Sequence, residues 1–294
     1  MNLIELFGKI DDFCNEFTPI WNKKLIELNK MKRNRNHQLS LSEMITIVIF
    51  FHQSGFRNFK DFYTKYVCIH LKNEFPKLLS YSRFVSLMPS VLIPLCVYLQ
   101  TNKGKNTGVS FVDSTPIKVC HNIRTNRNKV FYGLAQRGKS SIGWFFGFKL
   151  HLIVNDRGDI LNFCVTPGNI NDRVPVKKLA KFITGKMFGD RGYISQKLFA
   201  ELFENGLQLI TTIRKNMKNK FMPIIDKVLL RKRFIIETIN DQLKNISQIE
   251  HSRHRSVNNF MVNLLAGLAA YIHQPKKPSI KFYNGNLSRE LMAF

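Results

Sequence analysis

Carboxylates are scarce in this sequence, and their scarcity indicates the partner. The chain has 20 Asp and Glu against 45 Lys and Arg, which gives a formal net charge of +25. An excess of this size favours a polyanion, most simply nucleic acid, with a membrane surface as the alternative. No run of 18 or more apolar residues is present, and the acidic amphipathic start MNLIELFGKIDDF differs from a secretory signal. We therefore expect a soluble, cytoplasmic protein that does not span a membrane.

Two further absences remove common kinds of site. The five cysteines are scattered without a CxxC pair, which argues against a disulfide framework and a zinc site and favours reduced thiols. The glycine-containing basic loop YGLAQRGKSSIG (132–143) lacks the GxxxxGK[ST] spacing of a phosphate-binding loop. We expect no nucleotide cofactor.

The first hundred residues have the pattern of an all-helical domain. In LSLSEMITIVIFFHQSG, Ser40 and Glu43 form a capping box ahead of an apolar run that ends at Gly55. Short helices separated by a glycine turn fit a helix-turn-helix-like DNA-binding domain, and a plain helical subdomain fits equally well. The polar, turn-rich stretch 101–108 is the predicted linker.

After the linker the pattern becomes mixed. Strands are predicted at 109–120, 141–155 and 159–168, and then helix, strand, helix, strand and helix follow in order up to residue 250. By analogy, this is the element order of a ribonuclease H-like fold, a mixed five-stranded sheet with flanking helices. We predict a catalytic domain over 109–275 and a tail over 276–294.

Two aspartates are candidate site residues because of where they lie in the predicted strands. Asp113 lies in the middle of the first strand, in FVDST, where a charge is costly unless it is paired or metal-bound. Asp190 ends the fourth strand, in MFGDRGY, and sites form at such carboxyl ends. The two strands are neighbours in the predicted sheet, so the carboxylates lie side by side. Such a pair stays ionised beside a hard cation such as Mg²⁺ or Mn²⁺.

A third carboxylate lies in the basic helix LRKRFIIETINDQLK (230–244). At 100° per residue, Arg233, Glu237, Asp241 and Lys244 fall within about 80° of one another on one helical face. Ordinary surface charge pairs would give the same spacing. The helical pattern alone leaves both interpretations open.

The segments FVDST, MFGDRGY and RKRFIIETINDQLK together resemble the DDE transposases of bacterial insertion sequences. The Arg-Glu-Lys spacing of the insertion-sequence 4 group is met by Arg233, Glu237 and Lys244, while Leu230 stands where that motif has tyrosine. Segments such as VTPGNINDRVPV and GDRGYISQKLF extend a resemblance to the insertion-sequence 982 branch over about residues 25–280. The resemblance implies that Asp113, Asp190 and Glu237 hold two Mg²⁺ or Mn²⁺ ions and that Arg233 and Lys244 bind DNA phosphates.

The resemblance also implies the reaction and the partners. A polynucleotidyl transferase of this kind cuts double-stranded DNA at the terminal inverted repeats of its element and joins the 3′-hydroxyl to target DNA. It works in the bacterial cytoplasm, at the nucleoid, as a homodimer or higher oligomer that pairs two ends. The alternatives are a ribonuclease H-like nuclease without strand transfer and a catalytically inactive DNA-binding descendant.

The remaining candidates are secondary. Arg253 and Arg255 belong to a basic cluster for which phosphate contacts are favoured over a solvated charge run. Asp172 is predicted to cap a helix, and it is the substitute should Asp190 have no role. Asp241 is either a partner for a nearby cation or half of a surface pair. His121 is a loop residue that could contact DNA.

Overall fold

The computed structural model describes residues 2–29, 38–141, 143–212, 221–250 and 254–280. The chain forms two compact units, one of residues 1–102 with 243–275 and the other of residues 103–242 with 276–294. The first boundary, between residues 102 and 103, falls within the stretch 101–108 predicted as the linker. The second differs from the expectation, because residues 243–275 join the helical unit instead of the catalytic one. The physical reason is α11 (Val257–Ile272), a largely buried helix that packs against α2 and α6.

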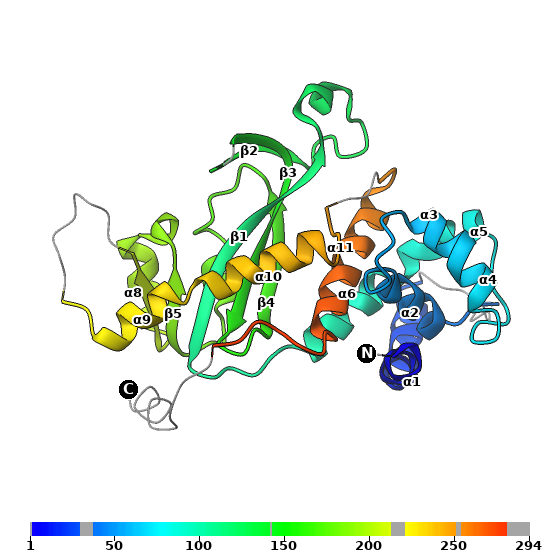
Figure 1. The fold of residues 1–294 in the computed structure, drawn as a ribbon, viewed down its shortest axis with the longest axis horizontal. Coiled ribbons are helices and arrows are strands. Elements are labelled where there is room, and N and C mark those ends of the chain that lie inside the picture. Colours follow the sequence, from blue (N-terminus) through cyan, green and yellow to red (C-terminus); the bar gives the residue numbers. More distant parts are fainter. Residues whose placement is uncertain (1, 30–37, 142, 213–220, 251–253, 281–294) are drawn as a thin grey trace. The chain divides into compact units, whose positions relative to one another are not determined.

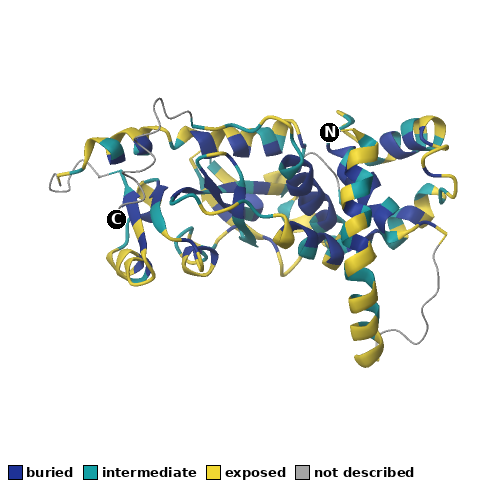
Figure 2. Ribbon diagram, turned by 90° about the horizontal axis from the view of Figure 1, so that it is seen from below, coloured by how far each residue is buried: buried dark blue, intermediate teal, exposed yellow. Residues whose placement is uncertain are grey.

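The helical unit contains α1 (Leu3–Glu27), α2 (Leu41–Phe51), α3 (Phe59–Asp61), the π-helix η1 (Phe62–Val67), α4 (Cys68–His70), α5 (Tyr81–Leu87), η2 (Met88–Val91), α6 (Leu92–Thr101) and α11. The predicted capping box starts α2, because Ser40 and Glu43 bond each other's backbone N–H groups at 3.1 and 2.6 Å. Gly55, with a φ of +76°, lies in the turn that follows α2. Helix α1 has its buried residues Leu6, Ile10 and Cys14 on one side of its first half, while its second half contains no buried residue (Figure 2).

One helical run is long and apolar enough to cross a membrane by length and composition alone. It covers Tyr81–Thr101, and 39% of its most apolar window is buried inside the unit. The run consists of α5, η2 and α6, with Pro89 at the start of η2 and Pro94 in the first turn of α6. Within the unit, η2 contacts α2, and both η2 and α6 contact α11.

The second unit contains a six-stranded mixed sheet. Its strands are β1 (Val109–Cys120), β2 (Gln136–Ser140), β3 (Gly143–Asn155), β4 (Ile160–Pro167), β5 (Gly185–Gly189) and β6 (Leu207–Thr211). The order is β2-β3-β1-β5-β6, and β4 also pairs with β3 (Figure 1). Strands β1 to β4 pair antiparallel, and β1, β5 and β6 pair parallel.

The prediction of five strands was wrong by one, because β2 lies in the segment predicted to be a basic loop. Its sequence QRGKS has no apolar alternation, and the strand forms by pairing with the first residues of β3. Gly138 is required there, since a Cβ atom would lie only 2.2 Å from the carbonyl oxygen of Gly168.

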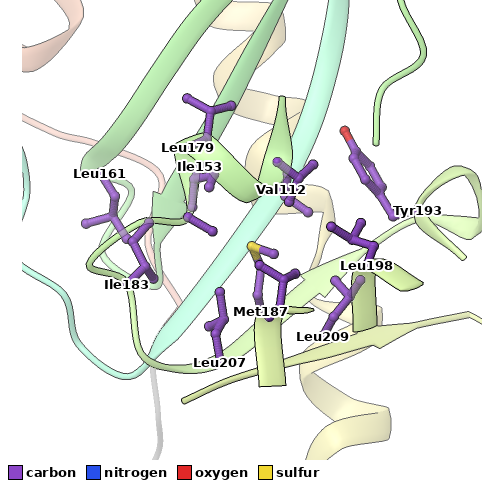
Figure 3. Packing of buried hydrophobic residues seen from close by; sticks show 13 residues of the cluster. Val112, Ile153, Leu161, Leu179, Ile183, Met187, Tyr193, Leu198, Leu207 and Leu209 are labelled. Atoms are coloured by element: carbon purple, nitrogen blue, oxygen red, sulfur yellow. The ribbon is translucent and has the colours of Figure 1, made fainter. Parts of the chain in front are cut away.

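Helices cover both faces of the sheet. On one face, α7 (Val176–Leu179) and α8 (Gln196–Phe203) contribute to an apolar cluster with Val112 and Met187 of the strands (Figure 3). On the other, α9 (Ile224–Arg231) packs on β5 and β6, and α10 (Phe234–Asn245) crosses the sheet (Figure 1). Two predicted helices therefore differ from the observed ones. The helix expected from residue 171 is only α7, and the helix expected over 230–250 is divided into α9 and α10.

Candidate active site

Strand register brings the two predicted aspartates together. Strands β1 and β5 are parallel neighbours, and Phe111 pairs with Phe188. Asp113 and Asp190 each follow two residues later, so both project from the sheet face that carries these phenylalanines. The two rings stack with centroids 5.6 Å apart on that face. The carboxylates therefore stand side by side where β5 ends.

The loop GDRGY orients Asp190 through its two glycines. Asp190 Oδ1 accepts a hydrogen bond from the backbone N–H of Gly192 at 2.9 Å. A Cβ atom on Gly192 would lie 2.9 Å from that same oxygen, so the approach depends on glycine. A Cβ atom on Gly189 would lie 3.1 Å from both Val112 and the ring of Tyr193. The spacing of the loop thus fixes one carboxylate and seats one buried tyrosine.

Helix α10 supplies the third carboxylate from its exposed side. The Glu237 side chain is 53% exposed, and its Oε1 atom lies 2.5 Å from Nη2 of Arg233. Arg233 precedes α10, in the junction with α9, so this pair joins the junction to the first turn of α10. Arg233 and Glu237, which were predicted to share one helical face, thus contact each other, although they do not lie within one continuous helix.

The residue of α10 that contacts Asp113 is Asn240, which was not among the predicted site residues. Its Nδ2 atom donates a hydrogen bond to Asp113 Oδ2 at 3.0 Å. Asn240 is 7% exposed, and its Oδ1 atom has no hydrogen-bond partner among the described residues. On a helix, Asn240 is about 60° from Glu237, so the amide that contacts Asp113 and the carboxylate whose charge acts on Asp113 lie one turn apart on neighbouring parts of the helix surface.

The electrostatics of Asp113 show that the three acids interact. Burial raises the pKa of Asp113 to about 7, and the negative charges of Asp190 and Glu237 act in the same direction. The Arg233 guanidinium and a hydrogen bond from the Ser114 backbone oppose this rise. At neutral pH Asp113 is therefore close to taking up a proton, which would remove one negative charge from the site, unless a further cation stabilises the ionised carboxylate.

The donor set has the chemistry of a site for a hard divalent cation. Such ions prefer carboxylate and amide oxygens, which Asp113, Asp190, Glu237 and the unpartnered Oδ1 of Asn240 provide. In the described part of the chain, no three His, Cys, Asp or Glu side chains are grouped closely enough to hold a metal ion in this conformation. The residues fit Mg²⁺ or Mn²⁺ in type and charge, and Arg233 is the cation that contacts one of them here.

Two more buried polar groups surround the acids. Tyr193 is 1% exposed, and its hydroxyl has no partner that satisfies hydrogen-bond geometry among the described residues. The nearby Ser114 side chain nevertheless acts to lower the pKa of the Tyr193 phenol. Burial raises its pKa well above the usual value, and Asp113, Asp172 and Asp190 raise it further, so the phenol keeps its proton. In Figure 3 the hydroxyl points away from the labelled aliphatic side chains.

His151 of β3 pairs across the sheet with Ser114, the residue after Asp113. Its Nε2 atom is 2.8 Å from Thr166 Oγ1, while Nδ1 has no partner in the described ranges. Burial lowers the pKa of His151 to about 4, with Asp172 opposing the shift and Lys149 reinforcing it. The imidazole is therefore neutral at physiological pH. A polar residue within an apolar strand was the available sequence signal for both His151 and Asp113.

The secondary candidates have varied surroundings. Asp172 does not cap α7, whose N-cap is Pro175, because its carboxylate pairs with Lys149 Nζ at 2.9 Å. Lys244 belongs to the helical unit, where its ammonium lies 3.4 Å from Glu250. Asp241 and Arg255 are exposed, and so is His121, which precedes the 3₁₀-helix η3 (Asn122–Arg127). Arg253 lies outside the described residues. The predicted phosphate contacts of Lys244, Arg253 and Arg255 stay predictions.

A known family model covers the part of the chain that contains these acids. The family model described as "Transposase DDE domain" matches residues 103–257, which is more than half of the chain and includes β1 to β6, α9 and α10. The chain belongs to this family, and it is thereby a polynucleotidyl transferase-type protein of DNA transposition.

Other comparisons add little detail. No curated protein matches the sequence. Among solved structures, the chain is similar to a piggyBac transposase in a cryo-EM synaptic complex with hairpin DNA. The TM-score is 0.48 at 11% identity, over 91% of this chain and 72% of that one.

Proposed function

We propose that the protein cuts DNA at the ends of an insertion sequence and joins the freed 3′-hydroxyl to target DNA, with Asp113, Asp190 and Glu237 as the catalytic acids. The observation that carries this proposal is the electrostatic coupling of three carboxylates from β1, β5 and α10 in a chain with an excess of 25 positive charges. A carboxylate cluster in so basic a protein suits metal-assisted chemistry on a polyanion.

The acids would hold Mg²⁺ or Mn²⁺, two ions by the resemblance to insertion-sequence transposases. When bound, such ions activate the attacking oxygen and stabilise the leaving 3′-oxygen. The chain's own residues position this arrangement. Asn240 and Gly192 each donate a hydrogen bond to one aspartate, at 3.0 and 2.9 Å, and so hold the two carboxylates in fixed orientations.

Arg233 is the residue best suited to receive the scissile phosphate. Its side chain is 21% exposed and already contacts Glu237, so a phosphate beside the acids would lie within reach of the guanidinium. Arginine binds phosphate oxygens in a bidentate manner, which fixes orientation as well as charge. The cutting step consumes water at phosphorus and releases a 3′-hydroxyl, and the joining step exchanges one phosphodiester for another. Neither step requires a covalent protein intermediate.

Finer assignments form part of the same proposal. The sheet is of ribonuclease H-like type, the branch is insertion-sequence 982, and the host compartment is the bacterial cytoplasm. The helical unit binds DNA, and a dimer or higher oligomer pairs two element ends. The supporting features are the parallel placement of β1, β5 and β6, the motif spacing of Arg233 and Glu237, and the exposed basic side chains.

The proposal is tested with a labelled DNA that carries the element's terminal repeat and with a target plasmid. Wild-type protein with Mg²⁺ should cut the repeat end and join it to the plasmid. Glu237→Gln and Asp190→Asn should lose both steps by at least about a hundredfold while they retain DNA binding. Cleavage without joining would favour a nuclease, and equal cutting by the variants would exclude this acid set.

A further inference from the structure

The helical unit contains a cleft of about 690 Å³ that is separate from the acidic site. Its lining comes from the end of α2, the turn into α3, α5, η2, the segment that leads into α11 and the first half of α11 itself. All of these elements belong to one unit. The volume is typical of a small-molecule or nucleotide site.

The charges around the cleft favour a phosphate. Arg57, Lys60 and Arg255 line it, all three side chains are exposed, and none of them pairs with a described carboxylate. No Asp or Glu belongs to the described lining. Two histidines also line the cleft, but burial lowers the pKa of His52 and of His254 to about 4. The positive charge of the lining is thus carried by the Arg and Lys side chains and not by the histidines.

The uncharged part of the lining fits a nucleobase. Phe59 and Tyr81 are half-buried, with ring centroids 6.5 Å apart, and they offer aromatic surface beside the cations. Asn259 Oδ1 and Asn263 Nδ2 both lack a hydrogen-bond partner among the described residues. The two asparagines are four residues apart on α11, so one acceptor and one donor lie on the same helical face. An adjacent acceptor and donor are what the edge of a base requires.

We propose that this cleft binds an unpaired nucleotide of a DNA strand, with its phosphate on Arg57 and Arg255 and its base beside Phe59, Tyr81 and the two asparagines. A base inside a duplex is stacked and paired, so it cannot enter a cleft, whereas a single-stranded or extruded nucleotide can. Asn263 is 7% exposed, and a buried amide without a partner is costly unless a ligand satisfies it. The inference deepens the proposed function and rests on it, since DNA is the assumed partner.

The test compares a short blunt duplex with the same duplex that carries a single-stranded 3′ extension, by fluorescence anisotropy with full-length protein and EDTA. Wild-type protein should bind the extended DNA at least about fivefold more tightly, the low end of what stacking of one base contributes. The variant Arg57→Gln/Arg255→Gln should lose this preference. The control Lys72→Gln/Lys77→Gln removes two exposed charges of the same unit outside the cleft, and it should keep the preference.

A second variant separates recognition from charge. Asn263→Leu removes the unpartnered amide and should reduce the preference for the extension, while the midpoint of thermal unfolding stays equal or rises. An unchanged preference in the arginine double variant, or no preference in wild-type protein, would overturn the inference. Tighter binding of free deoxynucleoside monophosphate or inorganic phosphate than of the extension would instead identify a small-molecule site.

The catalytic proposal can fail independently of this one. Glu237→Gln should bind the extended DNA as wild-type protein does, because Glu237 does not line the cleft. If no DNA is cut or joined but the preference depends on Arg57 and Arg255, only the catalytic proposal fails. If cutting requires the three acids but the preference for the extended DNA is unchanged in Arg57→Gln/Arg255→Gln, only the cleft assignment fails.

Discussion

Asp113→Asn should stabilise the protein at alkaline pH, which is unusual for a change at a buried charge. The pKa of Asp113 in the folded state is about 7, above its ordinary value of 3.8. A raised pKa means that the folded state holds its proton more tightly than the unfolded state, so stability is lost as pH rises through about 7. At about 1.4 kcal/mol per pKa unit, the ionised carboxylate costs about 4 kcal/mol once the pH is well above 7.

The asparagine variant removes this cost, since its amide oxygen can still accept the hydrogen bond from Asn240. The free energy of urea unfolding should therefore exceed that of wild-type protein by about 1 kcal/mol near pH 4.5 and by about 4 kcal/mol near pH 8.5. The control Asp12→Asn changes an exposed carboxylate of α1 and should show no such growth with pH. Added Mg²⁺ should stabilise wild-type protein at the higher pH and leave the Asp113 variant unchanged. A stability difference that is constant with pH, or a variant that is less stable than wild-type protein at high pH, would show that the ionised Asp113 carboxylate carries no such cost.

Three further predictions concern the residues around the acids. Gly192→Ala places a methyl group 2.9 Å from Asp190 Oδ1, so the cleavage rate should fall at least about tenfold. The control Gly8→Ala has open space around its Cβ atom and should leave the cleavage rate unchanged. Asn240→Leu removes a hydrogen-bond donor to Asp113, which should raise the pKa of Asp113 and move the pH dependence of cleavage to higher pH. The rate at neutral pH should fall about tenfold for each unit by which that pKa rises. An unchanged pH profile would show that the hydrogen bond has no electrostatic role. Tyr193→Phe removes a hydroxyl that has no hydrogen-bond partner among the described residues, so the free energy of unfolding should change by less than about 0.5 kcal/mol. A loss of several times that amount would show that the hydroxyl forms a hydrogen bond.

Apart from β2, the strand positions were predictable because the relevant signals are local. Strand β1 starts and ends where its apolar pattern does, and Ser195 caps α8 as its position before that helix indicates. Asp113 was identifiable as a charge within an apolar strand, and Asp190 as the end of a strand before a glycine. Their pairing followed from parallel neighbours, which the register of β1 and β5 provides.

What the sequence could not provide depends on contacts between distant residues. Strand β2 has no pattern of its own and exists by pairing with β3. The break between α9 and α10 contains neither Gly nor Pro, so nothing local marks it. Asn240 looked like one polar residue among several, and only the packing of α10 on the sheet shows that it meets Asp113. Residues 243–275 joined the helical unit because α11 packs there, which no composition shift indicates.

The central claim is that Asp113, Asp190 and Glu237 hold a divalent cation together. It is tested most directly by replacing Mg²⁺ with Fe²⁺, generating hydroxyl radicals at the bound ion, and locating the backbone cuts by mass spectrometry. We expect backbone cuts clustered near residues 113, 190 and 237 that are suppressed by competing Mg²⁺ and lost in Asp113→Asn/Glu237→Gln. Cuts located elsewhere, or cuts that persist unchanged in that variant, would contradict it.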